Sequence, residues 1–263
     1  MPQGSFGVVR AWNDFTAPPG GITTGVPDAL YNNLGGGWGL VGVNEGIIDL
    51  VVDEANGWLS ITTDTGDNDN HAIVAGAWRP SAGGMEMEIR LKPITSYATT
   101  RLAIFVGFTE TLALNTPVMP CEIATTTATY NGTGGMAGFV FDSDSTSLIW
   151  RFVAGDAGVA LATVDSTGTA GAAIGIDCAA TITLDKAMIF RLEMTPDGIC
   201  RGLFGDASDT PRDQGLKFIG RNTAALTSTK KFHACALIEN RVGSAHVMEV
   251  DYADARGFRD WSV

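Results

Sequence analysis

Charged residues are scarce in this chain. Asp, Glu, Lys and Arg make up 17% of its 263 residues, whereas residues with hydrophobic side chains make up 45%. An intrinsically disordered chain has the opposite balance, so the composition excludes disorder. The chain also lacks the bulk of alanine, glutamate, lysine, leucine and arginine that is typical of coiled coils and helical bundles. What remains is a folded protein that is not built from long helices.

Positive charge is especially scarce. The chain has 17 Lys and Arg against 29 Asp and Glu, a formal net charge of −12, and its densest basic stretch is the pair Lys230 and Lys231. Binding to nucleic-acid phosphates requires clustered Lys and Arg, so the sequence predicts no nucleic-acid surface. A surface with so little charge is poorly solvated in an isolated monomer. We therefore expect an oligomer or an assembly subunit, with part of the surface covered by partners.

Long apolar runs and clustered cysteines are absent too. No run reaches the roughly 18 apolar residues of a membrane-spanning helix, and residues 1–6 lack the basic region and apolar core of a secretory signal. These absences predict synthesis in a cytoplasm and no membrane partner. Because zinc sites use closely spaced ligands, we expect no metal, no cofactor and four free, buried thiols; the cysteines are Cys121, Cys178, Cys200 and Cys235.

Strand patterns, in contrast, are abundant. Apolar and charged side chains alternate strictly in residues 85–92, which predicts a strand with one buried face. Residues 189–195 repeat the pattern, and the turn Pro196–Gly198 leads to a predicted hairpin partner in residues 199–204. The positions expected to face inward are Met85, Met87, Ile89 and Leu91 in the first strand and Phe190, Leu192 and Met194 in the second.

A third alternating segment lies near the end of the chain. Met248, Val250 and Tyr252 alternate with Glu249 and Asp251, which predicts another strand. No amphipathic helical window survives the content of 33 glycines. Roughly a dozen short strands separated by turns predict an all-β fold, a two-sheet antiparallel sandwich of jelly-roll type.

The first 44 residues differ from the rest. They are rich in glycine and proline, which predicts an irregular N-terminal arm (residues 1–44) before a sandwich domain (residues 45–263). Aromatic residues in the arm indicate that it is docked, either on its own sandwich or on a neighbouring subunit, and both alternatives stay open. The candidate interface residues are Trp12, Phe15, Tyr31 and Trp38.

Two acidic segments are candidates for chemistry. Glu249, Asp251 and Asp254 superficially resemble the ExDxxE pattern of laminarinase-type β-sandwich hydrolases, but the last residue is Asp and the segment lies close to the C-terminus. We favour a solvated strand face as the explanation. The loop 64–70 carries acidic residues that suit calcium, or turns whose side chains bond their own backbone. No nucleophile elbow, P-loop or dinucleotide fingerprint is present, and we predict no catalytic residues.

Six segments follow one another in a particular order and spacing: residues 66–80, 84–91, 103–110, 138–144, 190–198 and 248–252. Over roughly residues 45–253 this succession resembles a family of bacteriophage virion proteins. The resemblance implies a concanavalin-like (lectin/glucanase-type) sandwich used as a structural head component, without enzyme activity.

The resemblance implies a capsid decoration or cement protein. Such a protein would sit on the outer head lattice of the virion, bind the major capsid protein and itself as a homotrimer, and be made in the host cytoplasm. The alternative is a carbohydrate-binding module of a tail or head fibre that binds host glycans through Trp58, Trp78 or Trp150. A third hypothesis is a laminarinase-like hydrolase acting through Glu249 and Asp251.

Overall fold

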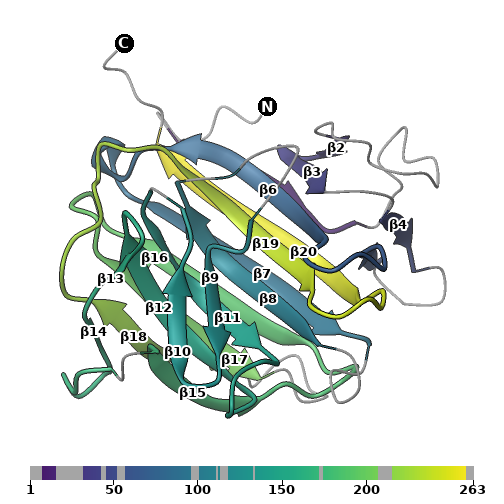
Figure 1. Ribbon diagram of the computed structural model, residues 1–263. Helices are drawn as coiled ribbons and strands as arrows, with labels where there is room; N and C mark the ends of the chain where they lie inside the picture. The colour runs from purple at the N-terminus through teal and green to yellow at the C-terminus, as the bar shows by residue number, and fades with distance from the viewer. Residues whose placement is uncertain are drawn as a thin grey trace.

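The strands form two large antiparallel sheets that lie face to face (Figure 1). The computed structural model describes residues 8–15, 32–42, 46–51, 57–95, 101–110, 112, 118–132, 134–171, 174–206 and 215–258. Within these ranges the helical content is a single 3-10 turn, η1 (Pro80–Ala82). No helix in the described part of the chain has the length and apolar character of a membrane span. The predicted two-sheet antiparallel sandwich is confirmed.

Sheet A contains the last strand in the described part of the chain. In spatial order its strands are β14 (Thr163–Val164), β18 (Lys217–Asn222), β17 (Cys200–Asp206), β16 (Met188–Met194), β7 (Met85–Pro93), β20 (Val247–Phe258), β5 (Leu59–Thr62) and β4 (Ile47–Leu50). The second half of β20 pairs with β1 (Val8–Asn13) instead of β5. The first and last described strands are therefore neighbours.

Sheet B lies opposite. In spatial order its strands are β13 (Val159–Ala160), β12 (Ile149–Asp156), β11 (Met136–Asp142), β8 (Leu102–Thr109), β19 (Phe232–Asn240), β6 (Asn70–Trp78), β3 (Trp38–Gly42) and β2 (Asn32–Gly35), and β15 (Ile176–Thr181) pairs with β12. A separate hairpin is formed by β9 (Cys121–Ala124) and β10 (Thr127–Tyr130).

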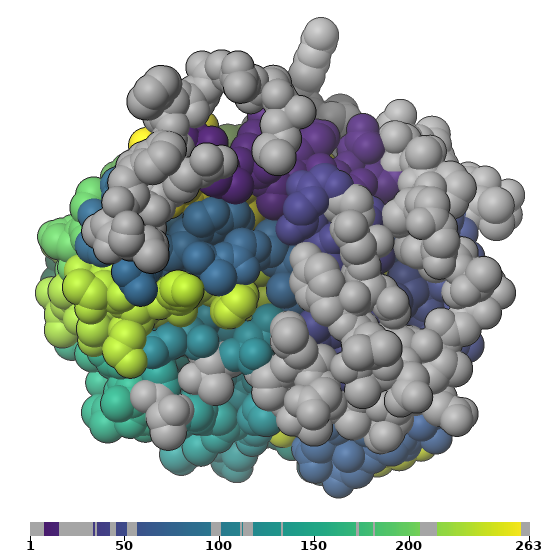
Figure 2. Space-filling view, turned by 90° about the horizontal axis from the view of Figure 1, so that it is seen from above, coloured from purple at the N-terminus to yellow at the C-terminus, as the bar shows by residue number. Residues whose placement is uncertain are grey.

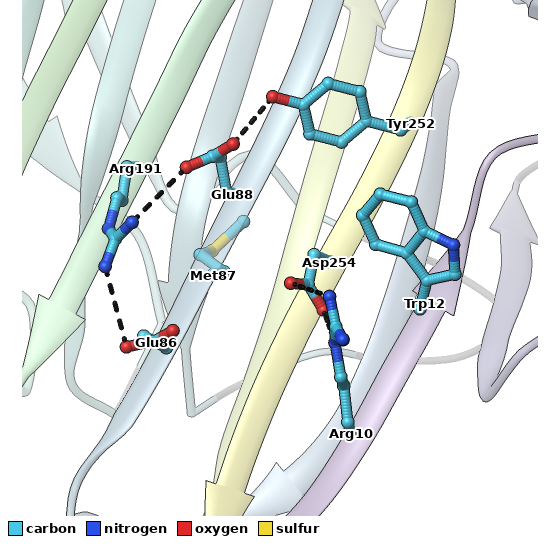
Figure 3. Close-up of a pocket in the computed structure, with 8 residues that line it drawn as sticks. All are labelled: Arg10, Trp12, Glu86, Met87, Glu88, Arg191, Tyr252 and Asp254. Atoms are coloured by element: carbon cyan, nitrogen blue, oxygen red, sulfur yellow. Dashed lines mark hydrogen bonds and ion pairs between the residues drawn. The ribbon is translucent and has the colours of Figure 1, made fainter. Parts of the chain in front are cut away.

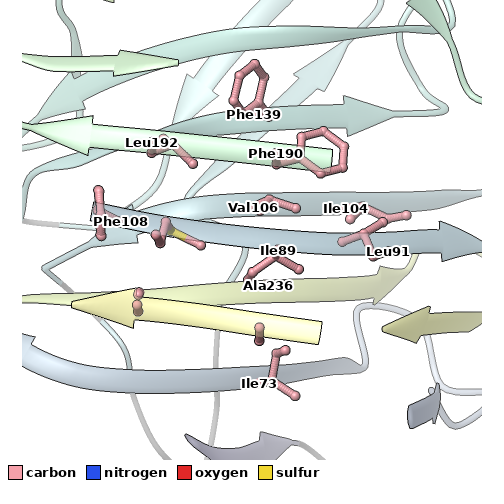
Figure 4. Packing of buried hydrophobic residues seen from close by; sticks show 14 of the residues in the cluster. Ile73, Ile89, Leu91, Ile104, Val106, Phe108, Phe139, Phe190, Leu192 and Ala236 are labelled. Carbon is pink, nitrogen blue, oxygen red and sulfur yellow. The ribbon is translucent and has the colours of Figure 1, made fainter. Parts of the chain in front are cut away.

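The main core fills the space between the sheets. The alternation predicted for β7 and β16 is confirmed, because their apolar side chains are buried and their polar ones face outward. The predicted pairing of residues 199–204 with β16 is confirmed by β17. Figure 4 shows Ile89 and Leu192 from sheet A packed against the side of sheet B that carries Val106. Each fully buried side chain of this size stabilises the fold by about 1.5–3 kcal/mol.

The outer face of sheet B is covered as well. The β9–β10 hairpin lies on it, in front of β11 and β12 in Figure 1. Every residue of β8 is buried, which explains why that strand reads as a continuous apolar run rather than an alternating one. We call the buried cluster under the hairpin the second core; it contains Val41, Ala72, Val74, Ala103, Phe105, Met119, Cys121, Ile123, Met136, Val140, Val153, Cys235 and Leu237.

Strands β1, β2 and β3 come from the stretch expected to be an arm, and they belong to the two sheets. The backbone N–H of Trp12 donates to the carbonyl oxygen of Gly36 at 2.9 Å, which joins β1 to the β2–β3 turn. A Cβ at Gly36, whose φ is +60°, would lie 1.8 Å from that tryptophan's carbonyl oxygen, so only glycine allows this approach. Figure 2 shows these purple strands continuous with the blue residues that follow them. The domain boundary at residue 44 stays a prediction.

Candidate functional site

A hollow of about 280 Å³ opens on the outer face of sheet A, over strands β1, β20, β7 and β16 (Figure 3). We call it the sheet A pocket. Its residues are far apart in the sequence and meet because the four strands are neighbours in the sheet. The lining residues are Arg10, Trp12, Glu86, Met87, Glu88, Arg191, Tyr252 and Asp254.

A β-bulge brings Tyr252 to this pocket. Val250 pairs with Leu91, but the next paired residue of β20 is Tyr252, so Asp251 is an extra residue in the ladder. The extra residue shifts the alternation by one position. The alternation of Met248 and Val250 therefore does not continue to Tyr252: Ala253, fully buried, takes the inward position, and Tyr252 faces outward.

Tyr252 and Trp12 form an aromatic pair at one wall of the pocket. Their ring centroids lie 5.6 Å apart with the planes 26° from parallel. Trp12 is 43% exposed, and the guanidinium of Arg10 lies 5.1 Å from the centre of its ring. The Tyr252 hydroxyl donates to Glu88 Oε1 at 2.7 Å. Burial, with this hydrogen bond, raises the pKa of Tyr252, so the hydroxyl stays protonated and keeps donating.

Charged side chains form two cross-strand rows on this face. Two positions in them place carboxylates directly opposite each other, Glu88 with Asp254 and Glu86 with Glu193. Like charges in direct opposition destabilise a sheet unless cations lie between them. In strand order, the rows are Trp12, Asp254, Glu88 and Arg191, and beside them Arg10, Arg256, Glu86, Glu193 and Arg201.

Diagonal ion pairs compensate these oppositions. Arg10 donates to both oxygens of Asp254 at 2.8 Å, and that hydrogen-bonded pair raises the pKa of Arg10. Arg191 lies 3.0 Å from Glu193, 3.6 Å from Glu88 and 3.8 Å from Glu86. Each of the four opposed carboxylates thus has a cation partner, and the pocket is lined by fixed donors and acceptors.

The four aromatic residues predicted to face a partner lie in different places. Trp12 is the exposed one and belongs to the sheet A pocket. Phe15 and Trp38 are buried in the main core, 1% and 0% exposed. Tyr31 lies outside the described residues. Contact of these residues with a partner stays a prediction, and Trp12 is the one of the described three whose ring is accessible.

The acidic pattern of β20 is divided among separate ion pairs. Glu249 lies 3.1 Å from Lys92, Asp251 pairs with Arg90, and Asp254 is held by Arg10. Each carboxylate therefore has its own cation from a neighbouring strand. Glycoside hydrolysis requires two carboxylates that face each other across a substrate groove. The three carboxylates of this pattern are not arranged in that way.

The three tryptophans expected to stack on sugars do not reach the surface. Trp58, Trp78 and Trp150 are 5%, 7% and 0% exposed. Trp58 lies under Lys92 and Arg90, whose charged groups are 4.5 Å and 5.1 Å from its ring centre. This prediction is wrong because Trp78 and Trp150 are part of the main core and Trp58 is covered by these two cations.

The acid-rich loop is a turn fastened to β19. Asn240 donates through its side chain to the carbonyl oxygens of Asp64 and Gly66 at 3.0 and 2.9 Å. Within the described ranges no group of three or more His, Cys, Asp and Glu is placed to hold a metal ion. The four cysteines are free and buried, and burial raises the pKa of each thiol, to about 12 for Cys235.

Sequence reasoning missed Arg10, Glu86, Glu88 and Arg191 as site residues. The alternation of β7 did place its glutamates on the outer face, but nothing local showed that β1 and β16 would lie beside them. The bulge would have shown that Tyr252 faces the pocket. It could not be found from the sequence, because it depends on the register of β20 with β7.

The two antiparallel sheets form a β-sandwich whose outer face carries the sheet A pocket. No family model matches the chain, and no curated protein matches it. Among solved structures, a protein of unknown function from Shewanella oneidensis MR-1 is similar with a TM-score of 0.57 and 12% identity, over 96% of this chain and 87% of that one. The carbohydrate recognition domain of Emp47p is similar with a TM-score of 0.50 and 10% identity, over 91% and 98% of the two chains. At these identities the likeness shows the fold.

Proposed function

We propose that this chain is a non-enzymatic carbohydrate-binding domain that holds a sugar in the sheet A pocket. The observation that carries the proposal is the stacked pair of exposed Trp12 and half-buried Tyr252, beside carboxylates and guanidiniums in one hollow. The C–H face of a sugar ring packs on aromatic side chains. Its hydroxyls donate to carboxylates and accept from guanidiniums, so one ring uses all three kinds of group.

The fold supports this proposal. Emp47p's domain of the same architecture is a carbohydrate recognition domain, which agrees with a glycan partner here. The volume of about 280 Å³ is at the small end of ligand pockets, which suits one sugar residue of a longer glycan.

Truncation of the exposed tryptophan tests the proposal. Trp12→Ala removes the aromatic wall and is expected to weaken binding by about tenfold or more, which corresponds to about 1.4 kcal/mol. A glycan panel with and without calcium identifies the sugar, and calorimetry measures its affinity. The matched control is Phe258→Ala. Phe258 lies on β20 and, like Trp12, is an exposed aromatic residue (37% exposed), but it does not line the pocket. A silent panel, or equal affinity of Trp12→Ala and wild type, would refute the proposal.

The capsid decoration role is a second candidate. Trp12 and Phe258 lie on the same outer face of sheet A, on paired strands, in a chain with only 17% charged residues. Exposed aromatics of this kind are typical anchors of protein interfaces. In this role the protein would bind the major capsid protein on the outer surface of the virion as a homotrimer. The test is its copy number on purified particles, which would have to be commensurate with the capsid lattice.

A further inference from the structure

The two cross-strand rows around the sheet A pocket are balanced in charge. They contain four arginines and four carboxylates, so their formal charges cancel. The arginines are Arg10, Arg191, Arg201 and Arg256, and the carboxylates are Asp254, Glu86, Glu88 and Glu193.

All eight groups are already paired within the protein. Arg10 holds Asp254, Arg256 pairs with Glu86, and Arg201 lies 2.7 Å from Glu193. Arg191 bridges Glu86, Glu88 and Glu193. A ligand with a net charge would have to displace one of these partners and leave a like-charged neighbour uncompensated.

We infer that the sheet A pocket selects an uncharged sugar residue and discriminates against acidic and amino sugars. This inference rests on the proposed function. A ligand carboxylate would approach Glu88 and Asp254, which oppose each other across β7 and β20, and repulsion would weaken it. A ligand ammonium would compete with Arg191 and Arg10 for carboxylates that these arginines already occupy.

An uncharged sugar leaves the ion pairs in place. Its hydroxyls bond the remaining lone pairs of the carboxylates and the remaining N–H groups of the guanidiniums. The Tyr252 hydroxyl already donates to Glu88, which fixes the carboxylate, so the sugar meets an oriented acceptor. Its affinity should therefore depend little on salt, because no charge on the ligand is screened.

A panel of matched sugars tests the inference on the wild-type protein. It compares the methyl glycosides of glucose, galactose and N-acetylglucosamine with glucuronate, galacturonate and glucosamine at neutral pH. The best neutral sugar is expected to bind at least about tenfold more tightly than its charged counterpart. Its dissociation constant should change less than about twofold between about 50 mM and about 500 mM NaCl.

A charge-balance variant sharpens the test. Arg191→Gln removes a positive charge from the pocket lining and leaves Glu88 without a cation. Glucosamine is then expected to gain at least about fivefold in affinity relative to N-acetylglucosamine. Arg201→Gln is the control, because it removes the same charge from the same rows but does not line the hollow. Its preference should match that of wild type.

The outcomes separate the two proposals. If a charged sugar binds wild type as tightly as its neutral counterpart, the inference is wrong while carbohydrate binding stands. The same holds if Arg201→Gln changes the preference as much as Arg191→Gln. If no sugar of either kind binds, the proposed function fails, and the inference with it.

Discussion

Tyr252 shows how one extra residue changes what a surface offers. The bulge at Asp251 turns the tyrosine outward, where it stacks on Trp12 and bonds Glu88. Without the bulge, the residue would point between the sheets and Ala253 would lie outside. The aromatic wall of the pocket therefore depends on one extra residue in the ladder of β20 with β7.

Removal of the Tyr252 hydroxyl tests this contact. Tyr252→Phe keeps the ring stacked on Trp12 but loses the 2.7 Å hydrogen bond to Glu88. We expect the free energy of unfolding to fall by about 0.5–1.5 kcal/mol, because a half-buried hydrogen bond is lost. Urea denaturation of the single variants and of Tyr252→Phe/Glu88→Gln gives the coupling between the two residues. A coupling of zero would contradict the contact.

At the scale of elements, the β9–β10 hairpin is held by a buried ion cluster. Arg241 lies 3.3 Å from Glu122 of the hairpin, 3.2 Å from Asp142 of β11 and 2.8 Å from Glu239 of β19. The Asp142 carboxylate also accepts the backbone N–H of Ile123 at 2.8 Å. The cluster fastens the hairpin to sheet B where the apolar side chains of the second core lie beneath it.

Loss of Arg241 should release the hairpin. Arg241→Met leaves buried carboxylates without their cation and is expected to cost about 3–5 kcal/mol of stability. Cys121 and Cys235 in the second core report local opening, whereas Cys178 and Cys200 in the main core report global unfolding. Alkylation followed by mass spectrometry should show the first pair modified before the second in the variant.

The wild type provides the reference for this experiment. Its four thiols are buried, so they should react slowly and together, through global unfolding. Simultaneous modification of all four thiols in Arg241→Met as well would mean that the cluster stabilises the whole fold and does not fasten the hairpin in particular.

Regular strands of this fold could be predicted from the sequence, and irregular ones could not. β7 and β16 alternate without interruption, since each has one face in the core and one in water. In β20 the alternation of inward and outward side chains shifts at Asp251, because the register with β7 shifts there. Register depends on two strands, so the sequence of β20 alone does not show this shift. The hairpin was missed because its strands are short and bury one side against another sheet rather than in the main core.

At the scale of the whole molecule, the sandwich could be predicted but the site could not. Counting short strands between turns is sufficient for an all-β fold. The sheet A pocket combines Arg10 and Trp12 from the first described strand, Arg191 from β16 and Asp254 from the last described strand. Which strands are neighbours follows from long-range pairing, so no local pattern brings these residues together.

Two opposing titrations act on the stability of the whole molecule. Burial raises the pKa of Glu239 to about 7, so between its ordinary value and pH 7 the folded state holds a proton that the unfolded state has lost. This contribution falls as pH rises. Burial lowers the pKa of His71 to about 4, so from its ordinary value near 6.5 down to pH 4 the unfolded state alone binds a proton. That contribution falls as pH decreases.

The two contributions change the free energy of unfolding in opposite directions between about pH 4.5 and pH 6.5, so they cancel in the wild type. A single substitution at either residue should leave the pH dependence of the other. Glu239→Gln, which imitates the protonated acid, leaves the histidine slope, so stability should rise with pH across this window. His71→Leu leaves the glutamate slope, so stability should decrease with pH. Each change should reach about 1–3 kcal/mol in urea denaturation at a series of pH values. Burial also raises the pKa of Asp142 and lowers the pKa of His246. Asp142 therefore acts in the same direction as Glu239, and His246 in the same direction as His71. Both residues remain in both variants. If the differences between wild type and both variants stay constant with pH, these buried groups do not titrate as the structure requires.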